Sequence, residues 1–158
     1  MDYTVFNFWM AVIILIISTF ELKMIQYQIE NNLSVDEFKE ILINSTLGER
    51  RPVNDPATLS KMLEHGNLII TARLNEKLIG IARSLTDFLY CTYLSDLAVD
   101  ESYQRMGIGK ELIRQTKLAS PNAKLILLAA PKAEKYYPKI GMTQFEQCYM
   151  LNNLEELK

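Results

Sequence analysis

The stretch "YQRMGIGKEL", residues 103–112, combines the residue types that a phosphate-binding loop needs. Gly107 and Gly109 leave the backbone free of side chains, and an amphipathic helix pattern begins directly after them. The first N–H groups of a helix lack partners within the helix, and the helix dipole adds partial positive charge there. Arg105 and Lys110 add full positive charges. The stretch therefore predicts an anion site built from backbone amides at a helix N-terminus.

Two common phosphate loops do not fit this stretch. A Walker A loop, G-x-x-x-x-G-K-[ST], would need a glycine at Gln104 and a hydroxyl at Glu111, whose carboxylate would repel a phosphate. A dinucleotide fingerprint, G-x-G-x-x-G, would need a glycine at Leu112 and an early position in the chain. The pattern Q/R-x-x-G-x-G/A does fit, through Gln104, Gly107 and Gly109. It predicts a pyrophosphate site that requires no metal ion.

The flanking segments predict one mixed sheet with helices on both of its faces. Alternating or continuous apolar residues indicate strands, and a 3.6-residue period indicates helices. Capping signals support two of the helices: Ser34 with Glu37, and Asp55 followed by Pro56. The expected strands are residues 24–30, 67–74, 77–85, 90–99, 123–130 and 143–151, and the expected helices are residues 34–46, 56–65, 107–118 and 131–141.

Two of these segments carry further expectations. The unbroken apolar run 123–130 is typical of a strand that is buried on both faces. The helix at 131–141 is expected to begin at Pro131 and to be stopped by Pro138. The sequence has no repeat and no low-complexity stretch, so residues 24–158 are expected to form a single domain.

The bulk composition excludes several classes of function. The chain has 158 residues and a net charge of −2, so no basic field indicates binding to nucleic acid or to an anionic membrane. The single histidine, His65, argues against a histidine-based metal site, and no metal is predicted. Cys91 and Cys148 lie in apolar runs and are expected as reduced core residues of a cytoplasmic protein.

Residues 1–23 are expected to form a hydrophobic N-terminal extension. The apolar run 8–17 is shorter than the roughly 20 residues that a membrane-spanning helix needs. A secretory signal is not supported, because only Asp2 is charged before the run and no cleavage site follows it. Three interpretations remain: a segment that packs on the protein or in an oligomer, a weak membrane anchor, or an over-extended reading frame with its true start at Met24. The last is favoured, because the domain pattern begins at Met24.

Two segments resemble motifs of the GNAT superfamily of N-acetyltransferases, which bind acetyl-CoA. The segment "LSDLAVDESYQRMGIGKELI", residues 94–113, is similar to that family's fourth strand and pyrophosphate loop. The segment "APKAEKYYPKIGM", residues 130–142, is similar to its A-x-x-F-Y-x-K-x-G-F helix. The resemblance covers residue 24 to about residue 151. It implies an α+β fold with α/β/α layers, in which helices cover both faces of a mixed, mostly antiparallel sheet of six to seven strands.

The resemblance also implies which residues bind acetyl-CoA. In the family a bulge separates the strand before the loop from its neighbour, and the freed backbone N–H groups bond the pantetheine arm and the acetyl oxygen. Leu97 and Val99 occupy those positions, whereas Ala130 stands where many members carry an asparagine that bonds the cofactor. The implied cofactor-binding residues are Leu97, Ala98, Val99, Gln104, Arg105, Met106, Gly107, Ile108, Gly109, Lys110, Ala133 and Tyr136.

Tyr137 is the predicted general acid. A phenol, with an ordinary pKa of about 10, can protonate the thiolate that leaves when the thioester is cleaved. The alternative role is a helix tyrosine that packs against the sheet, and this describes Tyr136 better.

The predicted general base is left open among three residues. The resemblance gives the base, or a group that holds water, to Tyr93 or Ser95. Asp96 is the only carboxylate nearby, but strand alternation places it on the opposite face from Tyr93, Ser95 and Leu97 unless a bulge shifts it. The alternative role for Asp96 is a carboxylate that accepts hydrogen bonds from neighbouring backbone amides.

These features predict an N-acetyltransferase that moves an acetyl group from acetyl-CoA directly to a primary amine of a small molecule in a ternary complex. Arg50 and Arg51 are candidates for binding a carboxylate or phosphate of the acceptor, and the alternative is that they are solvated loop charges. Two other functions stay open: acetylation of a protein N-terminus or lysine, and a non-catalytic acyl-CoA sensor. A homodimer through the C-terminal strands is implied by the resemblance alone.

Overall fold

The computed structural model describes residues 9, 10 and 24–158 and divides the chain into two compact units, residues 1–127 and 128–158. The first unit holds a five-stranded sheet in the order β1 (Gln26–Ile29), β2 (Leu68–Leu74), β3 (Lys77–Thr86), β4 (Cys91–Val99) and β5 (Lys124–Ile126). Neighbouring strands are antiparallel except for β4 and β5, which are parallel. The predicted mixed, mostly antiparallel sheet is therefore confirmed.

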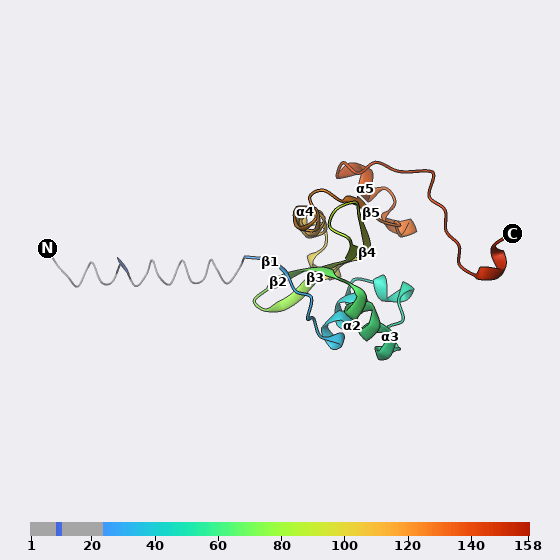
Figure 1. The fold of residues 1–158 in the computed structure, drawn as a ribbon. Helices are drawn as coiled ribbons and strands as arrows, with labels where there is room; N and C mark the ends of the chain where they lie inside the picture. The colour runs from blue at the N-terminus through green and yellow to red at the C-terminus, as the bar shows by residue number, and fades with distance from the viewer. Residues whose placement is uncertain (1–8, 11–23) are drawn as a thin grey trace. The chain divides into compact units, whose positions relative to one another are not determined.

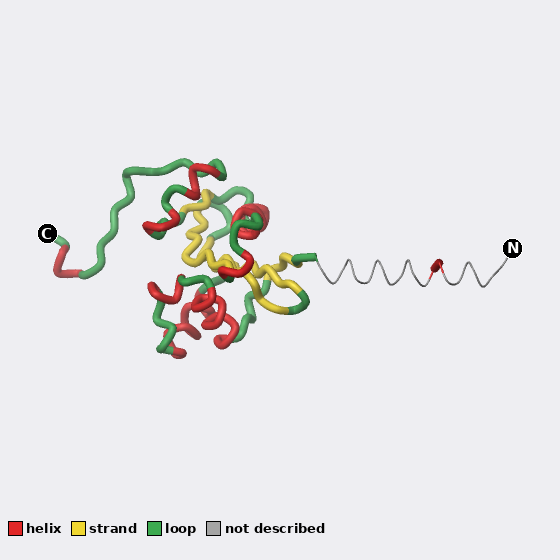
Figure 2. The backbone as a smooth tube through the Cα atoms, turned by 180° about the vertical axis from the view of Figure 1, so that it is seen from behind, coloured by secondary structure: helices red, strands yellow, loops and turns green. Residues whose placement is uncertain are grey.

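Helices cover both faces of this sheet, as predicted (Figure 1). α2 (Val35–Asn44) and α3 (Pro56–His65), joined through the short helix η1 (Leu47–Arg50), lie on one face. α4 (Ile108–Ala119) lies on the other face. The view from behind shows the same layers, with the strands of the first unit between its helices (Figure 2).

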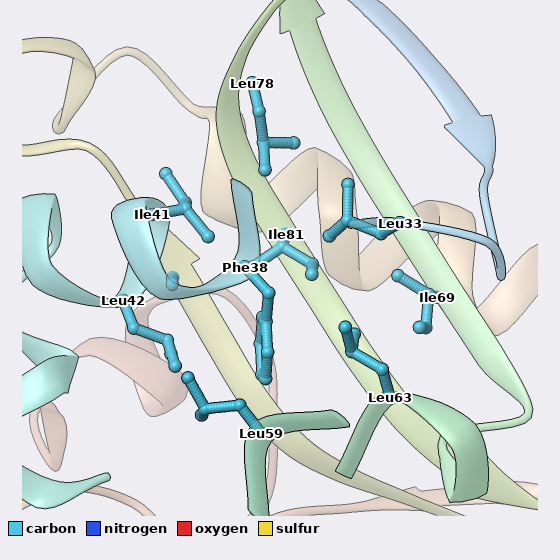
Figure 3. Close-up of a cluster of buried hydrophobic side chains, with 10 residues drawn as sticks. Leu33, Phe38, Ile41, Leu42, Leu59, Leu63, Ile69, Leu78 and Ile81 are labelled. Atoms are coloured by element: carbon cyan, nitrogen blue, oxygen red, sulfur yellow. The ribbon is translucent and has the colours of Figure 1, made fainter. Parts of the chain in front are cut away.

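Each face of the sheet has its own hydrophobic cluster. The cluster toward α2 and α3 surrounds the fully buried Phe38 and also contains Leu33, Ile41, Leu42, Leu59, Leu63, Ile69, Leu78, Ile81 and Ala98 (Figure 3). The cluster toward α4 contains Leu68, Ile70, Ala72, Ile79, Ala82, Leu94, Ile108 and Leu112. Burial of one large apolar side chain contributes about 1.5–3 kcal/mol, so these two clusters contribute much of the free energy that holds the helices on the sheet.

The first two helices begin at the predicted capping residues. Ser34 Oγ accepts a hydrogen bond from the Glu37 backbone N at 3.2 Å. The Glu37 carboxylate accepts from the Ser34 hydroxyl at 2.9 Å, and not from its backbone N–H as in a full capping box. The side chain of Asp55 accepts from the Thr58 backbone N at 3.1 Å, with Pro56 as the first residue of α3. These predictions depended only on local contacts, and the structure confirms the two starts.

The sheet has fewer strands than expected. The described residues contain five strands where six or seven were predicted, because residues 143–151 form no strand. Alternating apolar residues indicate which side chains share a face, but a strand also needs a neighbouring edge for its backbone hydrogen bonds. The sequence pattern contains no information about that edge, and the predicted closing strand is wrong.

The apolar run 123–130 also differs from its prediction. It forms only the three-residue edge strand β5, in which Lys124 and Ile126 are exposed. Pairing between β4 and β5 ends at Tyr93 and Ile126, because β4 changes course through a bulge two residues later. The prediction of a long strand buried on both faces is therefore wrong.

The second unit contains three short helices: η3 (Pro131–Ala133), α5 (Tyr136–Lys139) and η4 (Leu154–Glu156). The predicted helix 131–141 does begin at Pro131, but it is divided into η3 and α5. Pro138 does not stop it, because it occupies the third position of α5, where the backbone N–H has no helical partner to lose.

Two remaining expectations concern the cysteines and the N-terminus. Both cysteines are free, but Cys91 is half-buried and Cys148 is exposed, so their placement in the core is wrong. The three interpretations of residues 1–23 concern a segment that lies outside the described residues apart from Trp9 and Met10.

A partly buried ion pair between Arg73 and Glu30 predicts how the free energy of unfolding depends on pH. Arg73 donates to both oxygens of Glu30, at 2.9 and 2.8 Å, and Thr71 donates to the same carboxylate at 2.7 Å. The hydrogen bond from Arg73 is the main reason why the pKa of Glu30 falls from 4.5 to about 2. Since the folded pKa is depressed, the stabilisation is complete above the unfolded pKa and disappears as the pH falls through the folded pKa.

We expect Glu30→Gln to lower the free energy of unfolding at pH 7 by about 2 kcal/mol. The loss should shrink as the pH is lowered from about 5 to about 2. Arg73→Gln should flatten the same part of the profile, since it removes the main cause of the shift. Urea unfolding at several pH values measures both, and parallel profiles for wild type and Glu30→Gln would contradict the assignment.

Candidate functional site

The predicted anion loop connects β4 to α4 and ends at an uncapped helix N-terminus. Arg105 and Gly107 have positive φ angles of 64° and 85°, so the chain turns twice through the left-handed region. No side chain caps α4 at Gly107, and the first helical hydrogen bond is donated by Glu111 to the Gly107 carbonyl. The N–H groups of residues 108–110 therefore have no partner within the helix and are free to bind an anion.

The loop is anchored at both of its ends. On the β4 side, Gln104 Nε2 donates to the Val99 carbonyl at 3.0 Å. This bond explains why the motif has a glutamine here: its side chain ties the loop to the end of β4. On the helix side, Ile108 and Leu112 are buried against the sheet. They pack directly over Gly80, where an added Cβ would lie 3.1 Å from Leu112 Cδ1 and 3.2 Å from Ile108 Cγ2. The close approach of α4 to β3 thus fixes the height of the loop above the sheet.

The charges around the loop favour an anion. Arg105 and Lys110 are exposed. The one acidic group of the first turn, Glu111, is held by Arg114 through two hydrogen bonds of 2.8 and 2.7 Å. These bonds are the main reason why the pKa of Glu111 is lowered. The carboxylate stays ionised, but its charge is paired with a cation further along α4 and so repels a bound phosphate less.

β4 contains one more residue than the segment of β3 that it faces. Arg83 pairs with Asp96 and Ser84 pairs with Leu94, which leaves Ser95 as a β-bulge. A bulge bends its strand and takes the extra residue out of the ladder. The bulge that the family resemblance implied is therefore present at Ser95.

The bulge reverses which backbone groups of β4 face β3. Before it, the Cys91 carbonyl accepts a hydrogen bond from the turn that follows β3. After it, the Asp100 N–H donates to a β3 carbonyl, so even-numbered residues now face β3. The backbone N–H groups of Leu97 and Val99 consequently point away from β3. No described strand pairs with β4 on that side beyond Tyr93.

The bulge also changes which side chains share a face. Ala98 belongs to the cluster toward α2 and α3, whereas Leu97 packs against the cluster toward α4. Alternation places Tyr93 on the face of α2 and α3, and the contacts of Ser95 and Asp96 described below lie on that face too. The grouping of Leu97 with Tyr93 and Ser95 is therefore wrong, since strict alternation holds only in an unbroken strand.

Asp96 is the centre of a buried network. It is fully buried, and its two oxygens accept from Arg51 Nε at 2.5 Å and from Arg83 Nε at 2.5 Å. Arg51 also donates to the Ser95 carbonyl at 2.8 Å. Arg83 donates to Ser95 Oγ and to the Met62 carbonyl, each at 2.9 Å. The network joins the connection between α2 and α3, the end of α3 and both strands of the bulge.

These contacts change the interpretation of three predicted residues. Asp96 is satisfied by two guanidiniums and not by backbone amides, and neither of its oxygens is open to a proton from a substrate. Arg51 is not a solvated loop charge, because only 23% of its side chain is exposed and it is bonded to β4. Arg50 is exposed. Sequence reasoning missed Arg83, although a charge inside the apolar strand pattern "KLIGIARSL" was a signal for a buried ion pair.

The second unit carries the predicted general acid. The rings of Tyr136 and Tyr137 meet edge to face, with centroids 5.3 Å apart and an interplanar angle of 71°. Burial raises the pKa of both hydroxyls, and the neighbouring Tyr136 raises that of Tyr137 further. Ala133 is the last residue of η3. At neutral pH the Tyr137 hydroxyl therefore carries its proton.

Within residues 9, 10 and 24–158, no group of three or more His, Cys, Asp or Glu side chains is placed to hold a metal ion. In the same part of the chain, no helix is both long enough and apolar enough to cross a membrane.

Residues 34–155 match the family model described as the acetyltransferase (GNAT) domain. A GNAT family acetyltransferase from Streptococcus pneumoniae has 20% identity and a TM-score of 0.69, over 83% of this chain and 98% of that one. An acetyltransferase from Trypanosoma brucei has 21% identity and a TM-score of 0.59, over 82% and 100%. An aminoglycoside acetyltransferase from an uncultured soil sample has 24% identity and a TM-score of 0.60, over 82% and 94%. No curated protein sequence matches the chain significantly.

The buried network predicts a large loss of stability when its carboxylate is removed. We expect Asp96→Ala to lower the free energy of unfolding by about 3–5 kcal/mol, because two guanidiniums lose their shared partner. Glu64→Gln removes the carboxylate of an exposed pair with Lys61 on α3 and is the matched control. Denaturant unfolding compares the two variants. If Asp96→Ala unfolds at the same midpoint as the control, the network does not stabilise the fold.

Proposed function

The chain belongs to the GNAT acetyltransferases, and we propose that it transfers the acetyl group of acetyl-CoA directly to a primary amine of a small molecule. The donor and the acceptor are bound together in this proposal, so no covalent acetyl-enzyme forms. The family membership rests on the match of residues 34–155 to the acetyltransferase domain.

The observation that carries this proposal is that two sets of backbone N–H groups have no hydrogen-bond partner in the described structure. One set is the uncapped N-terminus of α4 and its loop. The other is the open side of β4 at Leu97 and Val99. In coenzyme A a pyrophosphate joins the adenosine 3′-phosphate to the pantetheine arm, whose amide carbonyls are further acceptors, so the molecule offers acceptors to both sets. We assign the pyrophosphate to residues 104–110 and the pantetheine arm to residues 97–99.

The side chains of the loop divide between these roles. Ile108 is buried and Ala98 is buried with its backbone toward β3, so any contribution that they make is through the backbone or through packing. Arg105 and Lys110 are exposed and supply charge. Ala133 and Tyr136 in the second unit are assigned to the cofactor from the motif resemblance.

The proposed reaction needs three proton movements, after which Tyr137 regains its proton. The acceptor ammonium first loses a proton, and its nitrogen then attacks the thioester carbonyl carbon. The C–N bond forms as the C–S bond breaks, and the coenzyme A thiolate takes a proton from the Tyr137 hydroxyl. The new amide nitrogen releases its second proton to water, and the Tyr137 phenolate takes a proton back from water. Because burial raises the pKa of Tyr137, the hydroxyl keeps its proton until the thiolate appears.

We assign the first proton movement to water held by Tyr93 and Ser95. Both residues lie on the face of β4 toward α2 and α3, next to the bulge. Neither is a good base at neutral pH, but each can orient a water molecule that accepts the proton. Asp96 is not assigned as the base, because both of its oxygens are bonded to arginines.

A small acceptor is supported by one of the structural neighbours. The acetyltransferase from the soil sample was solved in complex with the aminoglycoside sisomicin, a small molecule that carries amines. In this chain the exposed Arg50 is proposed to contact an anionic group of the acceptor.

The proposal is tested by measuring thiol release from acetyl-CoA with a panel of amines. The panel contains polyamines, amino acids, aminoglycosides, a peptide with a free N-terminus and a lysine-containing peptide with a blocked N-terminus. We expect turnover with at least one small amine. Turnover confined to the peptides would favour a protein acetyltransferase, and tight acetyl-CoA binding without turnover on any amine would favour a sensor.

Substitution of Tyr137 tests the general acid. We expect Tyr137→Phe to lower kcat about 10²- to 10⁴-fold while the Kd for CoA changes little, because the hydroxyl is needed only when the thiolate leaves. Tyr149→Phe, at a site in the same unit that is 92% exposed, is the matched control. Steady-state kinetics and calorimetry measure the two quantities, and an unchanged kcat in Tyr137→Phe removes this residue from the mechanism.

A further inference from the structure

We propose that Arg51 is a positioning residue that fixes the bulge of β4 and thereby the direction of the Leu97 and Val99 amides. This inference rests on the proposed function, in which those amides bind the pantetheine arm. It gives Arg51 a role different from the predicted contact with the acceptor.

Arg51 contacts the bulge through several directed hydrogen bonds and not through its charge alone. Its Nε donates to Asp96 Oδ1 at 2.5 Å, and its Nη2 donates to the Ser95 carbonyl at 2.8 Å. Its Nη1 donates to the Arg50 carbonyl at 2.9 Å. The planar guanidinium therefore connects the backbone of the α2–α3 connection with the backbone of the bulge. A lysine ammonium lacks this fixed, planar arrangement of donors.

The charge of Arg51 is not what Asp96 requires. Arg83, whose exposure is only 4%, already pairs with Asp96 and balances its single negative charge. What Arg51 adds is a partner for the Ser95 carbonyl, a group of the residue that the bulge takes out of the ladder. Arg83 holds the hydroxyl of the same serine. The carbonyl and the hydroxyl of the bulged residue are thus both held by guanidiniums.

We call the contacts of Arg51 with Ser95 and Asp96 the clamp. Its proposed effect is on the direction of the Leu97 and Val99 amides, which follow the bulge along β4. Asp96 and Ala98 are held by pairing with β3, but no described strand pairs with Leu97 or Val99 on the open side. A rotation of the peptide at Ser95 therefore changes where those amides point. The pyrophosphate loop is anchored separately, by the packing of α4 over Gly80. Loss of Arg51 should consequently weaken the binding of the pantetheine arm and leave the binding of the pyrophosphate unchanged.

The test compares Arg51→Lys and Arg51→Ala by calorimetry with two ligands. One is CoA, and the other is adenosine 3′-phosphate 5′-diphosphate, which has the pyrophosphate but no pantetheine arm. We expect both variants to bind CoA about tenfold more weakly than wild type and to bind the nucleotide as wild type does. With the most active amine of the panel, kcat should fall about 10- to 100-fold while the KM of the amine stays unchanged. Lys61→Ala, at an exposed site on α3, should bind both ligands as wild type does.

Each other outcome contradicts the proposal in a recognisable way. If Arg51 instead contacts an anionic acceptor, CoA affinity will not change, Arg51→Ala will raise the KM of the amine, and Arg51→Lys will restore it. If the affinities for CoA and for the nucleotide fall equally, the substitution loosens the fold in general, and the proposed role of Arg51 is contradicted. If wild type binds CoA and the variants bind it equally well, this inference alone fails. If wild type binds neither ligand, the proposed function fails and the inference fails with it.

Discussion

The arrangement of the first unit depends on one buried carboxylate, that of Asp96. An isolated charge without solvent access is costly by several kcal/mol, and it persists only where partners satisfy it. Here two arginines do so, one from β3 and one from the connection between α2 and α3. Arg83 also lies over the ring of Phe38, with 5.9 Å between the guanidinium carbon and the ring centroid. The ion pairs and the hydrophobic cluster therefore hold the same face of the sheet together.

The bulge next to this carboxylate links the fold to the proposed chemistry. One extra residue, Ser95, changes the face to which later side chains of β4 point and the side to which its later amides point. The pairing of β4 with β5 stops just before it, at Tyr93. As a result, the first half of β4 pairs with strands on both sides, whereas its second half pairs only with β3 and presents unpaired donors on the other side. Without the bulge, the backbone N–H groups of Leu97 and Val99 would donate hydrogen bonds to β3 and would not be open to a ligand.

Features that depend on neighbouring residues could be predicted from the sequence. Features that depend on residues far apart in the chain could not. Ser34, Asp55 and Gly107 mark the starts of helices because their contacts lie within a few residues, and all three starts were found. Arg51 and Asp96 are 45 positions apart, so no periodicity relates them. The alternation rule placed Leu97 on the wrong face, since it carries no knowledge of a bulge. The motif resemblance did imply the bulge, because that feature belongs to the family and not to the local pattern.

The division between backbone and side chain explains why the acceptor is the least predictable part of the site. The proposed contacts to coenzyme A use mainly amides, and an amide is the same whatever residue carries it. Structural neighbours share this fold at only 20–24% identity. The acceptor, by contrast, is proposed to meet side chains of the α2–α3 connection, and one residue of that connection, Arg51, is bonded to β4. If that bond holds the cofactor's donors in place, a change of acceptor cannot be made freely at position 51. The exposed Arg50 is then the neighbouring position at which specificity is free to vary.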